Sequence, residues 1–312
     1  MLARAILLGP QRHVPMVKPA VDFLAPPHDG APIAVVTAGW EEREAEDQEF
    51  KDHMQRPVRN LEIWRRVEHI FERDPELLAA MRMRHDTLRK VQELYRLRLV
   101  GLMDAARALL RRIGDSALLE PERQGALEMV QKLDRDHVAR VAAIHDEFEA
   151  RWRPGERAEV VGQRHELAAI VEAAPCVCIA GGHVAVLLHR LRLFDLLALI
   201  GRRPVVAWSA GAMILLPRIV LFHDDPPQGS ADPEVMEAGL AALPGLVVFP
   251  HARRRLKVHD QRNAQLMARR FEPDVCALLD ESSRLDFDGN RWSAPAGTLK
   301  LNDVGRLQEV GA

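Results

Sequence analysis

The 312-residue chain has few cysteines, almost no net charge and no long apolar run, and each absence excludes a class of protein. Three cysteines, two of them (Cys176 and Cys178) inside an apolar stretch, do not make a disulfide framework, so a reducing cytoplasm is the expected location. The formal charge of −2 provides no global attraction to nucleic acid or to a membrane. Without a run of about 18 apolar residues, no segment is expected to span a membrane.

Other signals are also missing. The apolar start MLARAILLGPQ is too short for a secretion signal and predicts a first strand instead. Repeats and low-complexity tracts are absent, and the arginine-rich segments are matched by acidic residues and lack aromatic platforms, which argues against nucleic-acid binding. A length of 312 residues is enough for one large domain or one domain with a sizeable insertion. The 47% hydrophobic content is enough to bury a core.

The two ends of the chain carry the pattern of an α/β protein. Short apolar segments bounded by glycine or proline predict buried strands at 3–8 and 32–38. After residue 155, expected helices alternate with expected strands. The strands are 176–180, 204–208, 246–249 and 275–279, the helices 156–173, 184–200 and 256–271, and the short β segments RLDF, NRWSA and TLKL end the chain. This alternation predicts an α/β fold with a doubly wound, mainly parallel sheet.

Residues 41–155 differ from the rest, because charged residues are dense there and no strand signal is visible until about residue 174. Asp74-Pro75-Glu76 predicts a helix start, and apolar residues recur every three or four positions after it. Gly114-Asp115-Ser116 is expected to break this helix, Pro121 to restart a second one and Pro154-Gly155 to end that one. With a further helix over 58–72, the sequence predicts a helical insertion at 41–155, and a catalytic domain made of 1–40 and 156–312.

A serine stands where an apolar strand ends, in the segment VVAWSAGAMILL. Ser209 is flanked by Ala207, Ala210 and Gly211, a small-x-Ser-x-Gly pattern typical of a nucleophile elbow. Such a turn is tight, and it places the serine hydroxyl at a helix start, where backbone N–H groups can stabilise an oxyanion. An ordinary strand–turn–helix junction with Ser209 as N-cap is the alternative interpretation.

Three further strands end on residues with catalytic chemistry. His251 follows the strand at 246–249, Asp280 and Glu281 follow the strand at 275–279, and Gly181-Gly182 follow the strand at 176–180. Parallel strands end at one edge of a sheet, where such folds place their sites. A serine needs a base, so the sequence predicts that these residues meet Ser209.

The segments IAGGHVAVLL, AWSAGAMIL, GLVVFPHARRRLKVHD and ALLDESSRLDFDG resemble peptidase family S51, the dipeptidase E and cyanophycinase group of the class I glutamine amidotransferase-like fold. The resemblance covers about 174–290 and the two N-terminal strands. It implies that Ser209 is the nucleophile, His251 the general base and Glu281 the carboxylate that orients the histidine. The N–H groups of Gly182, next to Gly181, and of Ala210 would form the oxyanion hole.

The same resemblance implies hydrolysis of an amide through an acyl-enzyme, with no metal and no cofactor. The implied substrate is a small peptide or amide with an aspartyl or β-aspartyl group, whose carboxylate Arg255 and its neighbours Arg253 and Arg254 could bind. His183 stands where the family usually has asparagine or aspartate, which makes it a further candidate for binding.

Several alternatives remain open from the sequence. Asp224, Asp225 or Asp280 could replace Glu281 as the third catalytic group. The chain could be an inactive S51-like scaffold whose helical insertion binds a partner or forms a homodimer. Glutaminase chemistry would need cysteine at position 209. A metal-binding helical bundle has only the segment from Asp134 to His137 in its favour, and this motif has no second copy.

Overall fold

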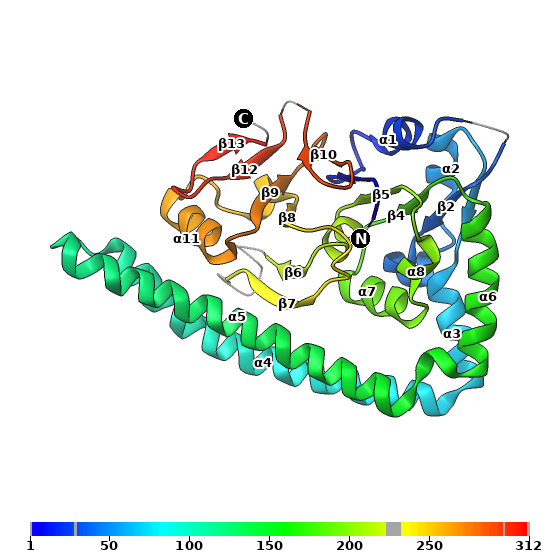
Figure 1. Cartoon of the computed structure of the whole chain (residues 1–312), viewed down its shortest axis with the longest axis horizontal. Helices are drawn as coiled ribbons and strands as arrows, with labels where there is room; N and C mark the ends of the chain where they lie inside the picture. The colour runs from blue at the N-terminus through cyan, green and yellow to red at the C-terminus, as the bar shows by residue number, and fades with distance from the viewer. Residues whose placement is uncertain (1, 28–29, 223–231, 296, 311–312) are drawn as a thin grey trace.

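The structure is a computed structural model that describes residues 2–27, 30–222, 232–295 and 297–310. It is a mixed α/β molecule with a central sheet, helices packed around it, a smaller sheet beside it and a long helical arm along one side (Figure 1). Among the helices of the described residues, none is both long enough and apolar enough to cross a membrane.

The central sheet has seven strands in the order β11-β10-β1-β5-β4-β2-β3. Their bounds are β1 Ala5–Leu8, β2 Ile33–Val36, β3 Val58–Asn60, β4 Val177–Ile179, β5 Val205–Trp208, β10 Arg284–Phe287 and β11 Trp292–Ser293. Neighbouring strands from β1 to β3 pair in parallel, and β10 and β11 add an antiparallel edge. The predicted mainly parallel sheet is therefore confirmed. Strands β1, β2, β4 and β5 are buried throughout, as expected for strands covered on both faces.

Strand β3 corrects the prediction that no strand lies between residues 41 and 174. Val58, Arg59 and Asn60 pair in parallel with β2 at the edge of the central sheet. The strand has three residues, none of them fully buried. A half-exposed edge strand of this length has no apolar run, so its sequence carried no signal.

A second correction concerns the strands that precede His251 and Asp280. Strands β8 (Leu246–Pro250) and β9 (Val275–Leu279) pair in parallel with each other, but in a separate sheet of order β13-β12-β9-β8. The other members are β12 Leu299–Leu301 and β13 Leu307–Glu309, while β6 (Arg218–Leu221) and β7 (Glu234–Ala238) form a two-stranded antiparallel ribbon. The prediction that all these strands share one sheet edge was wrong, because apolar alternation identifies strands but not their partners.

The shorter helices also follow the prediction in part. Their bounds are α1 Val17–Leu24, α2 Gln48–Met54, α3 Ile63–Arg73, α6 Ala158–Ala173, α7 Val184–Leu193, α8 Leu196–Ile200, α9 Ala210–Ile214, α10 Ala252–Arg255 and α11 Gln261–Phe271, with 3-10 helices at Ala38–Arg43 and Pro154–Glu156. The helix predicted over 184–200 is divided at Asp195, which adopts a left-handed conformation. The helix predicted over 256–271 begins only at Gln261, where Asp260 caps it.

The arm consists of helices α4 (Pro75–Arg111) and α5 (Ser116–Trp152), each of 37 residues. The predicted start is confirmed, because the Asp74 side chain accepts a hydrogen bond from the Leu77 N–H and Pro75 is the first helical residue. Pro121 lies inside α5, so the second helix begins five residues earlier than predicted, with Asp115 as its cap. Figure 1 shows the two helices side by side, with their joining tip beyond the rest of the molecule.

A buried polar cluster attaches the arm to the α/β layers. The Arg270 guanidinium of α11 contacts both Asp134 oxygens, at 2.7 and 2.8 Å, and donates to the Tyr95 hydroxyl at 2.9 Å. The Tyr95 hydroxyl donates to Asp134 at 2.7 Å, and the His137 ring is 2.9 Å from the Met236 carbonyl oxygen. Asp134 and His137, the residues of the sequence-level metal motif, thus dock the arm against neighbouring elements.

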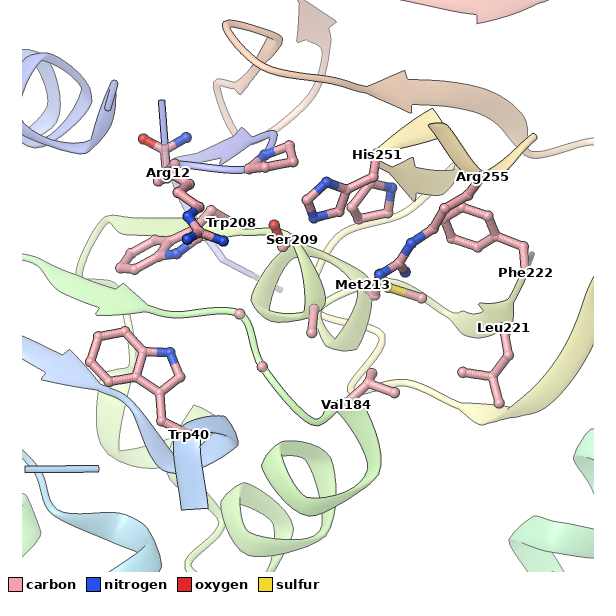
Figure 2. Close-up of a pocket in the computed structure, with 16 residues that line it drawn as sticks. Arg12, Trp40, Val184, Trp208, Ser209, Met213, Leu221, Phe222, His251 and Arg255 are labelled. Carbon is pink, nitrogen blue, oxygen red and sulfur yellow. The ribbon is translucent and has the colours of Figure 1, made fainter. Parts of the chain in front are cut away.

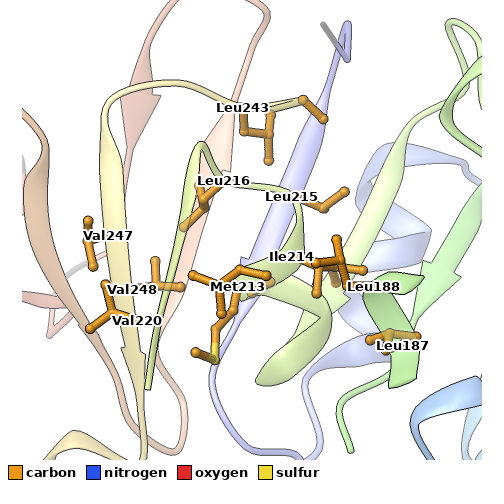
Figure 3. Packing of buried hydrophobic residues seen from close by; sticks show 14 of the residues in the cluster. Leu187, Leu188, Met213, Ile214, Leu215, Leu216, Val220, Leu243, Val247 and Val248 are labelled. Atoms are coloured by element: carbon orange, nitrogen blue, oxygen red, sulfur yellow. The ribbon is translucent and has the colours of Figure 1, made fainter. Parts of the chain in front are cut away.

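Apolar packing fixes the element that carries Ser209. Figure 3 shows α9 and the turn after it packed between α7 on one side and strands β6 and β8 on the other. The buried residues involved are Leu187, Leu188, Met213, Ile214, Leu215, Leu216, Val220, Leu243, Val247 and Val248. Since α9 has only five residues, this packing rather than intrinsic helix stability holds it in place.

Candidate functional site

Ser209 occupies a strained turn between β5 and α9. Its backbone has φ of 51° and ψ of −120°, a conformation that costs an L-residue on the order of 1–3 kcal/mol. The turn is held by the Ser209 N–H, which donates to the Leu8 carbonyl at 3.2 Å, and by the Ser209 carbonyl, which accepts from Ala212 at 3.0 Å. The surroundings therefore impose a geometry that the local sequence would not choose.

Close backbone contacts require the small residues around Ser209. A Cβ atom on Gly211 would lie 2.3 Å from the Ile179 carbonyl oxygen, and one on Gly181 would lie 2.9 Å from the Ser209 Cβ. Gly182 has φ of +124°, and its Cβ would lie 2.2 Å from the Gly39 carbonyl oxygen. The Gly181-Gly182 loop therefore lies directly against the Ser209 turn.

Two backbone donors beside this turn have no acceptor among the described residues. Neither the Gly182 N–H nor the Ala210 N–H donates to another described residue, whereas the next N–H along the loop, of His183, donates to the Gly39 carbonyl at 2.7 Å. Backbone donors without a partner next to a serine can accept the oxygen of a bound carbonyl group.

His251 lies in the same cavity as Ser209. It follows β8 in a left-handed conformation (φ 60°), and its N–H donates to the Leu279 carbonyl at 3.0 Å. Figure 2 shows its ring beside the Ser209 hydroxyl, both facing the cavity. Burial lowers the pKa of His251, the positive charges of Arg255 and Arg254 lower it further, and Asp280 and Glu281 oppose this effect. His251 is therefore neutral at pH 7 and able to accept a proton.

The cavity has a volume of about 510 Å³, which fits a small organic ligand. Its lining residues are Pro10, Gln11, Arg12, Trp40, Gly181, Gly182, Val184, Trp208, Ser209, Ala210, Met213, Leu221, Phe222, Pro250, His251 and Arg255. In Figure 2, Arg12 and Trp208 lie on one side of Ser209, and Arg255 lies on the other with Met213 and Phe222. A ligand that spans the serine would meet an arginine on each side.

The two acidic residues after β9 do not hydrogen-bond to His251 in this structure. Glu281 lies 3.8 Å from the ring of His13 and its side chain is 45% exposed. One Asp280 oxygen accepts from the Arg253 N–H at 3.0 Å. The charges of both carboxylates reach His251, yet among the described contacts no chain of hydrogen bonds joins Ser209, His251 and an acid. The alternatives Asp224 and Asp225 lie outside the described residues.

Of the other two predicted binding residues, one lines the cavity and one does not. Arg255 lines the cavity, with its guanidinium carbon 5.9 Å from the centre of the Phe222 ring. His183 does not line it; its Nδ1 accepts from the Val186 N–H at 3.2 Å, so it caps α7. His183 therefore stabilises the start of α7, a role that the family resemblance did not suggest.

Sequence reasoning missed the cavity residues contributed by the N-terminal segment. Arg12 and Trp40 follow β1 and β2, two strands that the sequence did predict. The argument from strand ends that selected His251 could have selected both of them. Their signal was weak because neither residue type on its own indicates catalysis.

Metal-type ligands converge elsewhere. In the described part of the chain, His145, His189 and Glu237 form a group of side chains whose ligand atoms lie close enough together to hold a metal ion. None of the three lines the Ser209 cavity.

The fold and cavity define an α/β protein with a cavity at a strand–helix turn, and one comparison with known proteins identifies its family. The model of peptidase family S51 matches residues 115–293, more than half of the chain, so the chain belongs to this family. The match spans the Gly181-Gly182 loop, Ser209, His251 and Glu281, and the family resemblance seen in the sequence is confirmed.

A solved structure also matches. The crystal structure of a peptidase from an acI-B1 Actinobacterium aligns with 100% of this chain and 96% of its own, with a TM-score of 0.49 and 12% sequence identity. A search of curated proteins found no match.

Proposed function

We propose that this peptidase is a serine hydrolase that cleaves an amide bond of a small substrate through an acyl-enzyme on Ser209. The observation that carries the proposal is the strained Ser209 turn, which faces one cavity together with the neutral His251. Membership of family S51 supports it. In this proposal the turn is a nucleophile elbow.

The geometry supports a two-step mechanism. His251 accepts the Ser209 proton while the serine oxygen attacks the substrate carbonyl carbon, and the resulting oxyanion is stabilised by the Gly182 and Ala210 N–H groups. His251 then protonates the leaving amine, and the C–N bond breaks. In the second step His251 activates water, which hydrolyses the ester and regenerates Ser209.

A carboxylate is needed to orient the His251 ring. We assign the role to Glu281, whose exposed side chain can exchange its weak contact with His13 for the His251 ring. Asp280 is the alternative, but its carboxylate is already engaged with the Arg253 N–H.

The substrate class follows from the cavity and the family resemblance. A volume of about 510 Å³ suits a dipeptide-sized molecule, and Arg255 can bind a carboxylate on one side of Ser209. We therefore propose an aspartyl or β-aspartyl peptide-like substrate.

We also propose that residues 1–40 and 156–312 form a catalytic unit of the class I glutamine amidotransferase-like fold. The parallel order β1-β5-β4-β2 supports this, and so does the position of α4 and α5 between β3 and β4 in the chain. Because β3 pairs with β2, the part of 41–155 that stands outside the sheet begins after Asn60.

The proposal is tested by intact-mass labelling with a small fluorophosphonate or sulfonyl fluoride. The wild type should gain one adduct, and Ser209→Ala and His251→Ala should gain none while remaining folded by circular dichroism. Cleavage of aspartyl dipeptides and β-aspartyl peptides is then compared in the same three proteins. A wild type that is neither labelled nor active on these peptides would overturn the proposal.

A second candidate, an inactive scaffold, is favoured by one observation. Both candidate carboxylates contact other side or main chains rather than His251. In that case the arm of α4 and α5 would carry the function by binding a partner or a second copy of the chain. Adduct formation at Ser209 would exclude this candidate.

A further inference from the structure

Three elements that are distant in sequence meet between the arm and the α/β layers. His145 lies on α5, His189 on α7 and Glu237 on β7. Figure 1 shows α5 passing along β7 and α7. The candidate ligand atoms of these three side chains all lie within 4.8 Å of one another.

Both imidazoles point the same nitrogen at the same carboxylate oxygen. The Nε2 atom of His189 lies 3.0 Å from Oε2 of Glu237, and the Nε2 atom of His145 lies 3.4 Å from it. The three side chains are 16%, 12% and 4% exposed for His189, His145 and Glu237 respectively. Two histidines and a glutamate converge here in a region largely shielded from water.

We propose that His145, His189 and Glu237 bind one divalent zinc ion that ties the arm to the α/β layers. Imidazole and carboxylate are zinc ligands at about 2.0–2.2 Å, and a tetrahedral site of that size separates its ligand atoms by about 3.3–3.6 Å. The two distances from the histidine Nε2 atoms to Glu237 Oε2, 3.0 and 3.4 Å, are close to this spacing, and all three candidate ligand atoms lie within 4.8 Å of one another. Side-chain movements would complete a three-ligand site, with the fourth position left for water.

A second layer of contacts orients the carboxylate. Arg192 donates to Oε1 of Glu237 at 2.9 Å, which leaves Oε2 directed at the two rings. The same guanidinium donates to the Ala238 carbonyl at 2.6 Å, so its position is fixed. Ligating carboxylates in zinc proteins are commonly hydrogen-bonded in this way.

The positive charges nearby have partners. Arg84 faces Glu149 at 3.9 Å and stacks on the Phe148 ring, while Arg192 pairs with Glu237. The donor set also fits ferrous iron, which uses two histidines and one carboxylate, but the same site binds zinc more tightly in the usual order of divalent metals. Zinc is therefore the ion to test first.

The test uses the full chain, freed of metal by a chelator and titrated with Zn²⁺ by calorimetry, with metal content measured by mass spectrometry. We expect one zinc per chain and a rise in the thermal unfolding temperature. His145→Gln and Glu237→Gln should each weaken binding by at least about tenfold. His85→Gln, a substitution of an exposed histidine on α4, is the matched control and should leave binding unchanged.

Replacement of Zn²⁺ by Co²⁺ adds a spectroscopic readout. The visible absorption of tetrahedral cobalt should appear in the wild type and in His85→Gln, and disappear in His145→Gln. Circular dichroism establishes that each variant is folded. Zinc binding that is absent from the wild type, or unchanged in both ligand variants, would overturn the proposal. Tighter binding of Fe²⁺ than of Zn²⁺ would overturn the assignment to zinc.

Discussion

At the scale of single residues, the environment of His251 determines when it can act as a base. Its pKa is lowered by burial and by Arg255 and Arg254, so the neutral form persists to more acidic pH than in a free histidine. Activity that needs neutral His251 should therefore rise with pH below the ordinary value of 6.5 and be level at pH 7.

The first prediction follows from the charge of Arg255. Arg255→Gln removes a positive charge that lowers the pKa of His251, so the acidic limb of the pH profile should move to higher pH. The measurement is the rate of Ser209 labelling by a neutral sulfonyl fluoride between pH 4 and 8, a range that brackets the ordinary histidine pKa. Arg253→Gln is the comparison variant, since Arg253 is not one of the main groups that shift this pKa and its side chain faces Asp280 at 3.7 Å. An unmoved limb in Arg255→Gln would contradict the argument.

The second prediction separates the two carboxylates. If Glu281 orients His251, Glu281→Gln should slow labelling by at least about a hundredfold, because an uncharged partner no longer holds the required imidazole tautomer. Asp280→Asn should instead leave labelling and stability nearly unchanged, because the asparagine side-chain oxygen can still accept from the Arg253 N–H. Labelling rates and urea unfolding of both variants decide the matter. Slow labelling in Asp280→Asn alone would transfer the role to Asp280.

At this scale the sequence identified residues that the structure brings to one cavity, namely Ser209, His251, Gly181, Gly182 and Arg255. The role of Glu281 stays a prediction, since no hydrogen bond joins it to His251 among the described contacts. The direction of Glu281 depends on a turn with Ser282 at φ of 66° and on His13 from another segment. Neither of these has a local sequence signal.

At the scale of elements, the packing of α9 against β4 depends on the absence of a side chain at one position. A Cβ on Gly211 would lie 2.3 Å from the Ile179 carbonyl oxygen. This oxygen belongs to the backbone of β4, so it cannot move aside as a flexible side chain could. The small residues that identified the serine turn in the sequence are thus required by contact between two backbones.

The third prediction is that Gly211→Ala destabilises the fold by about 1–3 kcal/mol, the usual cost of overpacking, and slows labelling of Ser209. Gly162→Ala, on α6, meets nothing within 4 Å and should instead stabilise the fold by up to about 1 kcal/mol. Urea unfolding of the two variants measures both effects. Equal stability changes would show that helix propensity, not the contact with Ile179, decides the outcome.

Strand prediction succeeded or failed according to burial. The fully buried strands β1, β2, β4 and β5 carry apolar runs that any sequence reading detects. The half-exposed β3 carries none. The assignment of β8 and β9 to a second sheet follows from long-range packing, which the alternation of apolar segments does not encode.

At the scale of the whole molecule, the arm is docked in part by a charged pair that is almost completely buried. Arg270 and Asp134 have side chains 1% and 4% exposed, and the Tyr95 hydroxyl completes their hydrogen bonds. The apolar stripes predicted the two long helices. They did not predict this docking, because Arg270 and Asp134 are 136 positions apart.

The last prediction concerns this pair. Asp134→Ala leaves the Arg270 charge buried without a counter-ion and should destabilise the molecule by about 3–5 kcal/mol in urea unfolding. Asp136→Ala is the control on the same helix, since Asp136 pairs with Lys132 at an exposed site and its loss should change little. The double variant Asp134→Leu with Arg270→Met should recover most of the lost stability, because apolar groups of similar size can replace a buried ion pair. Hydrogen exchange in α4 and α5 should increase in Asp134→Ala and return toward the wild-type rate in the double variant. If the double variant were as unstable as Asp134→Ala, the loss would come from shape rather than from an unpaired charge, and the arm would be docked by its apolar contacts.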